Sequence, residues 1–451
     1  MEWMIKVGQL LLSLSILVLL HEGGHFLAAR LFKTRVEKFY LFFDFLFPFP
    51  NLLKFSLFKI KRGDTEYGLG WFPLGGYVKI AGMLDESADK EQLKQPPQPW
   101  EYRSKKTWQR LIIILGGIIV NLLVGFFLYA MTMFIWGEKY LPTEQAKYGI
   151  WVTDSLGFEM GLQHGDKIKS IDNQEVKGFH QIIGRLVIDQ AKSIQIERNG
   201  ESIDLPVSDA FIRDAIKRVK KTGIIEPRIP FYVGVFGPDS PAQKAGIQTD
   251  DQILALNHEP TPFFDQFLEK ISVYKDQEVI VSVLRNQDTL HIPVHTTNEG
   301  RIGVGPQAMR DLEKKGIFEF KVQKYGFFAS IPAGFNKAVK VIVDYAKQLK
   351  LMFSPKTEAY KQVGGFKSIA SIFPAEWNWE AFWNLTAFLS LVLAFMNFLP
   401  IPMLDGGYMI FILYEMIVGK PPGEKFMEYA NTVGFILILA LLLYANLNDF
   451  F

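Results

Sequence analysis

Residues 19–32 read LLHEGGHFLAARLF and close an apolar run, 4–32, that is long enough to cross a bilayer. His21, Glu22 and His25 within it carry side chains that are costly to place in hydrocarbon. Residues four apart lie on one face of a helix, so the two imidazoles lie one turn apart. This H-E-x-x-H spacing is typical of zinc sites whose glutamate activates the attacking water. A divalent cation would compensate the polar groups, and the alternative is a histidine pair hydrogen-bonded to neighbouring helices.

Composition limits the class of protein. The chain has 451 residues, 49% of them hydrophobic, and a formal net charge of +2. It is too long for one ordinary domain and too apolar for a fully soluble one. Without a charge excess we expect no nucleic-acid partner. Because cysteine is absent, a transition-metal site must use His, Asp and Glu.

Four segments read as membrane spans. The first is 4–32, the second 111–136, the third begins after Trp383 and the fourth is 433–447. The first could instead be a signal peptide, but it lacks a basic start and an A-x-A-like cleavage site. We therefore predict four crossings.

Lysine and arginine predict the orientation. They are concentrated between the first two spans and before the fourth, for example at Arg30, Lys33, Arg35, Lys38, Lys61, Arg62, Lys105, Lys106, Lys420 and Lys425. By the positive-inside rule these connections are cytoplasmic, which puts both termini and residues 137–376 outside.

A catalytic zinc needs a third protein ligand. The other five histidines lie within 137–376 and hence on the wrong side, so a carboxylate at membrane depth is expected. The candidates are Asp44, Asp405 and Glu415. We favour Asp405, because two prolines interrupt the span just before it, and a broken helix is tolerated in a membrane only where it lines a cavity or is covered by protein. Asp44 stays a rival ligand.

The outer region contains a repeat. MGLQHGDKIKSIDNQEV (160–176) aligns with AGIQTDDQILALNHEPT (245–261), and QIERNGESIDLPV (195–207) with VSVLRNQDTLHIPV (281–294). Each unit resembles a PDZ domain, and PDSPAQKAGI (238–247) is similar to that family's stretch before its central strands. The alternative is two unrelated small β-rich domains. A PDZ groove accepts an extended peptide or a free C-terminus as an added strand.

Residues 53–82 alternate and turn at Arg62-Gly63-Asp64, which predicts a small antiparallel sheet on the cytoplasmic side. We predict an edge strand that binds the unwound substrate at Thr65, Glu66, Tyr67, Gly68, Leu69 and Gly70. The alternative is that the sheet only anchors its loop.

Two further segments have patterns of their own. Residues 335–353 place apolar side chains at helical spacing opposite lysines, which predicts an amphipathic helix on the membrane surface, on the PDZ pair or against an ordinary core. VGGFKSIASIF (363–373) is interpreted as part of a gate or clamp.

Three features of the sequence point to a known family: HEGGH in the first span, NFLPIPMLDGG in the third, and the PDZ-like units between spans two and three. With these features the chain resembles the bacterial site-2 intramembrane metalloproteases of the regulator-of-sigma-E protease type. The resemblance covers nearly the whole chain. It implies one catalytic zinc held by His21, His25 and Asp405, with Glu22 activating the water. It also implies that Asn397, together with Pro400 and Pro402, positions the unwound substrate.

By this resemblance the substrate is a single-pass membrane protein, such as an anti-sigma factor already trimmed by a site-1 protease, and the enzyme lies in the bacterial inner membrane with its PDZ pair in the periplasm as a size filter. A non-catalytic membrane-anchored PDZ scaffold is the alternative. One departure concerns FYLFFDFLFPFPN (39–51), where such proteins usually have Gly-x-Gly in a membrane-dipping hairpin. We interpret this stretch as re-entrant or interfacial.

The expected fold is a polytopic α-helical membrane protein with four transmembrane helices, a small cytoplasmic-side β-sheet and two extracytoplasmic PDZ-like α/β domains. The expected divisions are helix 1 (1–33), a re-entrant and β-rich segment (34–110), helix 2 (111–136), PDZ-like domains (137–226 and 227–310), a clamp segment (311–376), a broken helix 3 (377–418), and a loop with helix 4 (419–451).

Overall fold

The computed structural model describes residues 2–46, 52–73, 75–83, 96–218, 223–355 and 357–450. Residues 47–51 of the re-entrant stretch and 84–95 of the following segment lie outside this range. The chain forms two compact units. The first comprises Met1–Gly137, Lys324–Ala346 and Val363–Phe451, and the second comprises Glu138–Gln323 and Lys347–Gln362.

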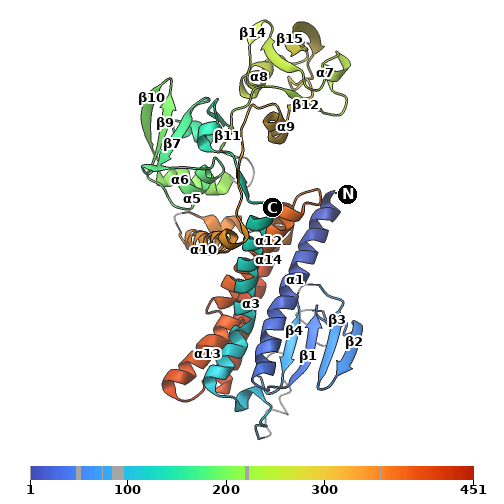
Figure 1. Ribbon diagram of the computed structural model, residues 1–451, viewed down its shortest axis with the longest axis vertical. Coiled ribbons are helices and arrows are strands. Elements are labelled where there is room, and N and C mark those ends of the chain that lie inside the picture. The colour runs from blue at the N-terminus through green and yellow to red at the C-terminus, as the bar shows by residue number, and fades with distance from the viewer. Residues whose placement is uncertain are drawn as a thin grey trace. The chain divides into compact units, whose positions relative to one another are not determined.

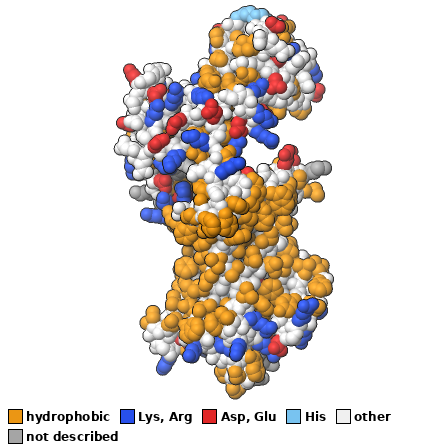
Figure 2. Space-filling model, viewed as in Figure 1, with side chains coloured by type: hydrophobic (Ala, Val, Ile, Leu, Met, Phe, Trp, Pro, Cys, Tyr) orange, Lys and Arg blue, Asp and Glu red, His pale blue; other side chains and the backbone are white. Residues whose placement is uncertain are grey.

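Helices dominate the first unit. They include α1 (Glu2–Leu31), α3 (Thr107–Ile135), α11 (Phe366–Ile372), α12 (Trp379–Phe398), α13 (Asp405–Val418) and α14 (Glu424–Asn448). Four of them, α1, α3, α12 and α14, are long and apolar enough to cross a bilayer, which confirms the expected number. On the face shown in Figure 2 their surface is covered by hydrophobic side chains. The chain is therefore a membrane protein.

Helix α3 packs against both α1 and α12 and so connects the elements around the His pair (Figure 1). A β-carbon at Gly24 of α1 would collide with the backbone of Gly116 on α3, so the two helices touch at these glycines. Because of this close approach, the segment of α1 that carries His21 and His25 lies against the α3 backbone.

The third span is interrupted, as its prolines predict. Helix α12 ends at Phe398 and α13 begins at Asp405, and the residues between them form no helix. A β-carbon at Gly406 or Gly407 would collide with the backbone of this break, and one at Gly434 of α14 would collide with the backbone of Pro402. The break is thus covered by protein on the α14 side.

A four-stranded sheet follows α1. It contains β1 (Val36–Leu41), β2 (Ser56–Arg62), β3 (Thr65–Gly70) and β4 (Tyr77–Ile80) in the order β2-β3-β1-β4. The prediction that Thr65–Gly70 is an edge strand is wrong. The hairpin with β2 forms as expected, but β1 pairs with β3 in parallel and occupies its other side, so the edges are β2 and β4. The parallel pair also corrects the expected purely antiparallel sheet.

The second unit contains short strands and helices. Its strands are β5 (Glu138–Tyr140), β6 (Ile150–Val152), β7 (Lys167–Ile171), β8 (Gln174–Glu175), β9 (Ser193–Arg198), β10 (Glu201–Pro206), β11 (Ile225–Pro227), β12 (Val233–Phe236), β13 (Gln252–Leu256), β14 (Glu259–Pro260), β15 (Glu278–Arg285), β16 (Asp288–His295), β17 (Val304–Pro306) and β18 (Lys321–Gln323). Its helices are α4 (Ser155–Glu159), α5 (Gln181–Val187), α6 (Asp209–Arg218), α7 (Pro241–Lys244), α8 (Phe264–Ile271) and α9 (Met309–Lys314).

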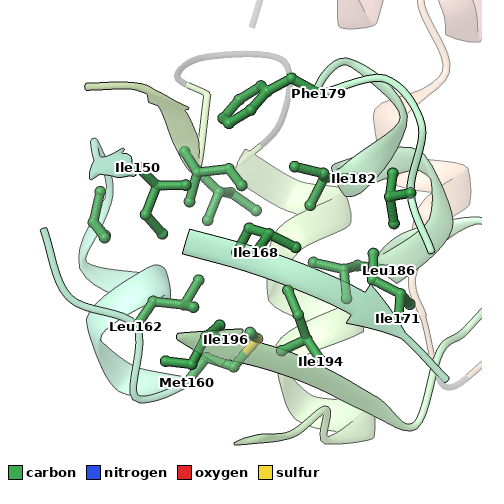
Figure 3. Close-up of a cluster of buried hydrophobic side chains, with 14 of the residues drawn as sticks. Ile150, Met160, Leu162, Ile168, Ile171, Phe179, Ile182, Leu186, Ile194 and Ile196 are labelled. Atoms are coloured by element: carbon green, nitrogen blue, oxygen red, sulfur yellow. The ribbon is translucent and has the colours of Figure 1, made fainter. Parts of the chain in front are cut away.

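The sequence repeat is a structural repeat. The sheet β10-β9-β7-β8 and the sheet β16-β15-β13-β14 have the same order relative to the chain, and each encloses its own hydrophobic core. In the first, isoleucines of β7 and β9 pack with Ile182 and Leu186 of α5 (Figure 3). The alternation along these strands therefore serves to bury one face.

Each repeat also holds the same buried ion pair. Arg198 donates from Nε and Nη2 to Asp166 at 2.8 Å, and Arg285 donates to Asp251 at 2.7 and 2.6 Å. Both aspartates are 1% exposed. The ion pairs thus explain why both repeats have an aspartate at this position, and no bound ligand is needed to account for these buried carboxylates.

The expected amphipathic helix is present as α10 (Phe327–Met352), which begins earlier than the apolar spacing indicates. Ala338 and Ile342 of this helix pack with Leu128 of α3 and Leu391 of α12. This part of α10 therefore faces a helical core, which was the stated alternative to a position on the membrane surface or on the PDZ pair.

Candidate metal centre

Three predicted ligands come together in the first unit. His21 and His25 lie on α1, and Asp405 is the first residue of α13, directly after the break in the third span. The Nε2 atoms of the two histidines are 3.3 Å apart, and each is 3.4 Å from Oδ2 of Asp405. Within the described residues, this is the one cluster of three His, Asp or Glu side chains with metal-ligand spacing.

The cluster fits a divalent metal ion. Oδ2 of Asp405 is buried and has no hydrogen-bond partner in the described part of the chain, a costly state for a carboxylate oxygen. Ligand atoms about 2.0–2.1 Å from a tetrahedral zinc lie roughly 3.3–3.4 Å from one another. The observed separations match this value, and the set of two histidines and one carboxylate is one that catalytic zinc sites use.

Glu22 and Asn397 flank the cluster. Glu22 follows His21 on α1 and lines the cavity together with Val78 of β4. The side-chain amide nitrogen of Asn397 lies 3.4 Å from Nε2 of His21, near the end of α12. Both side chains line the same cavity as the three candidate ligands.

That cavity measures about 540 Å³ and is large enough for several side chains. Apolar residues from the segment after β1, from β4, from α11 and from the break form much of its wall, namely Phe42, Phe43, Val78, Phe366, Met403 and Leu404. It combines an apolar wall with a few convergent polar groups, as binding sites do.

Two cavity residues have unusual backbone angles. Phe42 has a φ of 67° and Met403 a φ of 81°, which is the left-handed region that side chains other than Gly rarely adopt. Phe42 lies in the stretch where related proteins were expected to have Gly-x-Gly. Such strain is concentrated at functional sites.

Several expected site residues lie elsewhere. Thr65, Glu66, Tyr67, Gly68, Leu69 and Gly70 form the interior strand β3, where a β-carbon at Gly68 would collide with the Tyr40 ring. Pro400 and Pro402 shape the break, while its cavity-lining residues, within the described chain, are Met403 and Leu404.

The rival carboxylates have other partners. Asp44 accepts a hydrogen bond from the Tyr77 hydroxyl at 3.0 Å, and Glu415 pairs with Arg110 of α3. Burial, reinforced by the Asp44 carboxylate, raises the pKa of Tyr77 above its ordinary value, so the phenol stays a donor. The metal cluster therefore does not use Asp44.

Sequence reasoning missed the contribution of α3. His25 Nδ1 lies 2.9 Å from the carbonyl oxygen of Ile113, and His21 Nδ1 lies 3.1 Å from Nδ2 of Asn121. A backbone carbonyl leaves no sequence signal. Asn121 does leave one, because it is an amide inside an apolar span.

Comparison with known proteins identifies the family of the chain. The regulator of sigma E protease of Haemophilus influenzae is 26% identical over all of this chain and 99% of its own length. That of Salmonella typhimurium is 27% identical over 99% of this chain and 98% of its own. A candidate zinc metalloprotease of Treponema pallidum is 27% identical over 99% of both chains. Residues 9–441 match the model of Peptidase family M50, so the chain belongs to this family and is a membrane-embedded protease.

Proposed function

We propose that the protein is a zinc metalloendopeptidase that cleaves the transmembrane segment of single-pass membrane proteins. The observation that carries this proposal is the convergence of His21, His25 and Asp405 beside Glu22, at a cavity among apolar helices. Zinc supplies Lewis acidity, which polarises the scissile carbonyl and lowers the pKa of water.

The protein side chains perform the proton transfers. Glu22 takes a proton from the attacking water and delivers it to the leaving amine. The Asn397 amide donates a hydrogen bond to the oxygen on which negative charge develops. These roles require Glu22 to act without being a metal ligand.

The substrate has to be unwound, because a transmembrane helix uses its own amides in hydrogen bonds. Strand β4 is an edge of the sheet, and its residues Tyr77 and Val78 line the same cavity as Glu22. We therefore assign strand addition to β4, where an extended substrate would gain main-chain hydrogen bonds beside the cluster.

The repeated domains are proposed to be PDZ-like, at 137–226 and 227–310. Their common strand order, with a helix between the second and third strands of each sheet, supports this assignment. A peptide or a free C-terminus would add as a strand in the groove of one of them.

Localisation is proposed to be the bacterial inner membrane, with the PDZ-like pair in the periplasm. Support comes from the basic side chains that follow α1 and precede α3 (Figure 2), which the positive-inside rule assigns to the cytoplasm. The names of the relatives, regulator of sigma E protease, support a role in the control of a sigma factor. An anti-sigma-factor-like substrate that a site-1 protease has already trimmed is proposed from the resemblance described above.

Cleavage of a tagged single-pass membrane substrate by purified protein tests the proposal. Wild-type protein should cleave it and contain one zinc per chain, whereas Glu22→Gln should retain the zinc and lose cleavage by several orders of magnitude. A chelator should abolish wild-type cleavage, and added zinc should restore it.

A non-catalytic scaffold predicts the opposite results. Its function would survive the chelator and the Glu22→Gln substitution. Wild-type protein without zinc, or cleavage by Glu22→Gln at the wild-type rate, would contradict the proposed mechanism.

A further inference from the structure

Asn121 is a fully buried amide in the apolar helix α3 that the proposed proton transfers do not use. Its Nδ2 lies 3.1 Å from Nδ1 of His21, while its Oδ1 has no hydrogen-bond partner within the described chain. An unsatisfied amide oxygen among membrane helices is costly. Its position against a candidate metal ligand requires an explanation.

The position of the proton on each imidazole ring explains why Asn121 lies beside His21. His25 Nδ1 lies 2.9 Å from the Ile113 carbonyl, which can only accept, so the ring proton is on Nδ1 and the Nε2 lone pair faces the cluster. His21 also faces the cluster through Nε2, and the same tautomer needs an acceptor at its Nδ1. Turning the Asn121 amide by 180° exchanges its nitrogen and oxygen and places Oδ1 at that position.

We propose that Asn121 is a positioning residue whose side-chain oxygen accepts the Nδ1–H of His21 and so holds its Nε2 lone pair towards the metal. This inference rests on the proposed metal site. It gives His21 the kind of partner that the Ile113 carbonyl gives His25, and both partners come from α3. The reversed amide gives Oδ1 a donor, and Nδ2 then takes the position at which the described chain offers no partner.

The surroundings of Asn121 hold it in place. Its backbone carbonyl accepts a hydrogen bond from the Ser390 hydroxyl of α12 at 2.7 Å. One turn earlier on α3, a β-carbon at Gly117 would lie 2.5 Å from both His21 Cε1 and His25 Nε2. The two imidazoles therefore rest against a backbone with no side chain at this point, and Asn121 contacts the ring nitrogen that faces away from the cluster.

Metal binding by the detergent-solubilised protein tests this role. Chelator-stripped protein is titrated with Co²⁺, whose visible spectrum reports ligand geometry, and with Zn²⁺ in competition with a chelator. Asn121→Leu, similar in size but without an acceptor, should weaken metal binding by about 10–100-fold. Asn121→Asp keeps an acceptor and should bind at least as tightly as wild type.

Asn384→Leu is the matched control, because this amide of α12 bonds to the Glu380 carbonyl at 2.9 Å and touches no candidate ligand. It should leave metal binding unchanged. If Asn121→Leu fails to accumulate, Asn121→Ala removes the same acceptor without added apolar volume and should show the same loss.

Wild-type affinity and spectrum in Asn121→Leu or Asn121→Ala would overturn the inference and leave the proposed metal site intact. Equal losses in Asn121→Asp and Asn121→Leu would also overturn it, because a packing role would then suffice. If wild-type protein bound no metal, the proposed site and this inference would both fail.

Discussion

Gly23 and Gly24 are adjacent in HEGGH, yet their surroundings differ. A β-carbon at Gly24 would collide with the α3 backbone, whereas one at Gly23 would lie more than 4 Å from every described heavy atom beyond its own stretch of helix. The close approach of helices therefore explains Gly24, while packing does not explain Gly23. That Gly23 leaves space for the substrate stays a prediction.

Alanine substitutions at the two positions should have opposite effects on stability. Gly24→Ala should destabilise the α1–α3 contact by about 1–3 kcal/mol, because the backbone has to move. Gly23→Ala should stabilise the helix by roughly 0.5–1 kcal/mol. Thermal unfolding in detergent measures both effects. Equal shifts of the unfolding temperature with the same sign would contradict the close contact between α1 and α3 at Gly24.

At the scale of elements, β4 is the edge strand of the sheet that lines the cavity with the candidate metal ligands. It pairs with β1 on one side and lines the cavity with Tyr77 and Val78, and β2, the other edge, is almost wholly exposed along its length. A substrate strand could add to either edge by backbone geometry alone. Only addition at β4 brings the strand to Glu22.

Cysteine cross-linking distinguishes the two edges, and the natural chain contains no cysteine that would interfere. In a Glu22→Gln background, Val78→Cys should form a disulfide with a cysteine placed near the cleavage site of the substrate. Lys59→Cys on β2 is the control and should not. Preferential cross-linking at position 59 would refute addition at β4.

At the scale of the whole molecule, the chain divides into a helical unit with the metal cluster and a β-rich unit with a duplicated ion pair. The two units have separate hydrophobic cores. Damage to one core is therefore expected to leave the other folded.

Arg285→Met should unfold the second repeat without removing the metal. It leaves Asp251 buried and unpaired, which costs about 3–5 kcal/mol. Limited proteolysis should show faster cleavage within 227–310, with unchanged zinc content. Lys270→Met breaks the exposed pair with Glu259 and should cost less than about 1 kcal/mol. Loss of zinc in Arg285→Met would mean that the units are energetically coupled.

The sequence by itself determined the four spans, the break in the third, the duplicated strands and the pairing of His21 with His25. All of these depend on local periodicity, on proline chemistry or on one helical turn, which neighbouring residues specify. The repeat further identified Asp166 and Asp251 as equivalent positions, although not that Arg198 and Arg285 form ion pairs with them.

Only the tertiary structure decided which strand is the edge and how the ligand set is completed. The parallel pairing of β1 with β3 is a contact between segments with no pattern in common, so the alternation of Thr65–Gly70 could not reveal it. Asp405, rather than Asp44, lies beside the imidazoles because α13 starts at the break, and Asn121 lies beside His21 because two glycines let α1 and α3 touch. Such long-range contacts depend on packing across the whole unit.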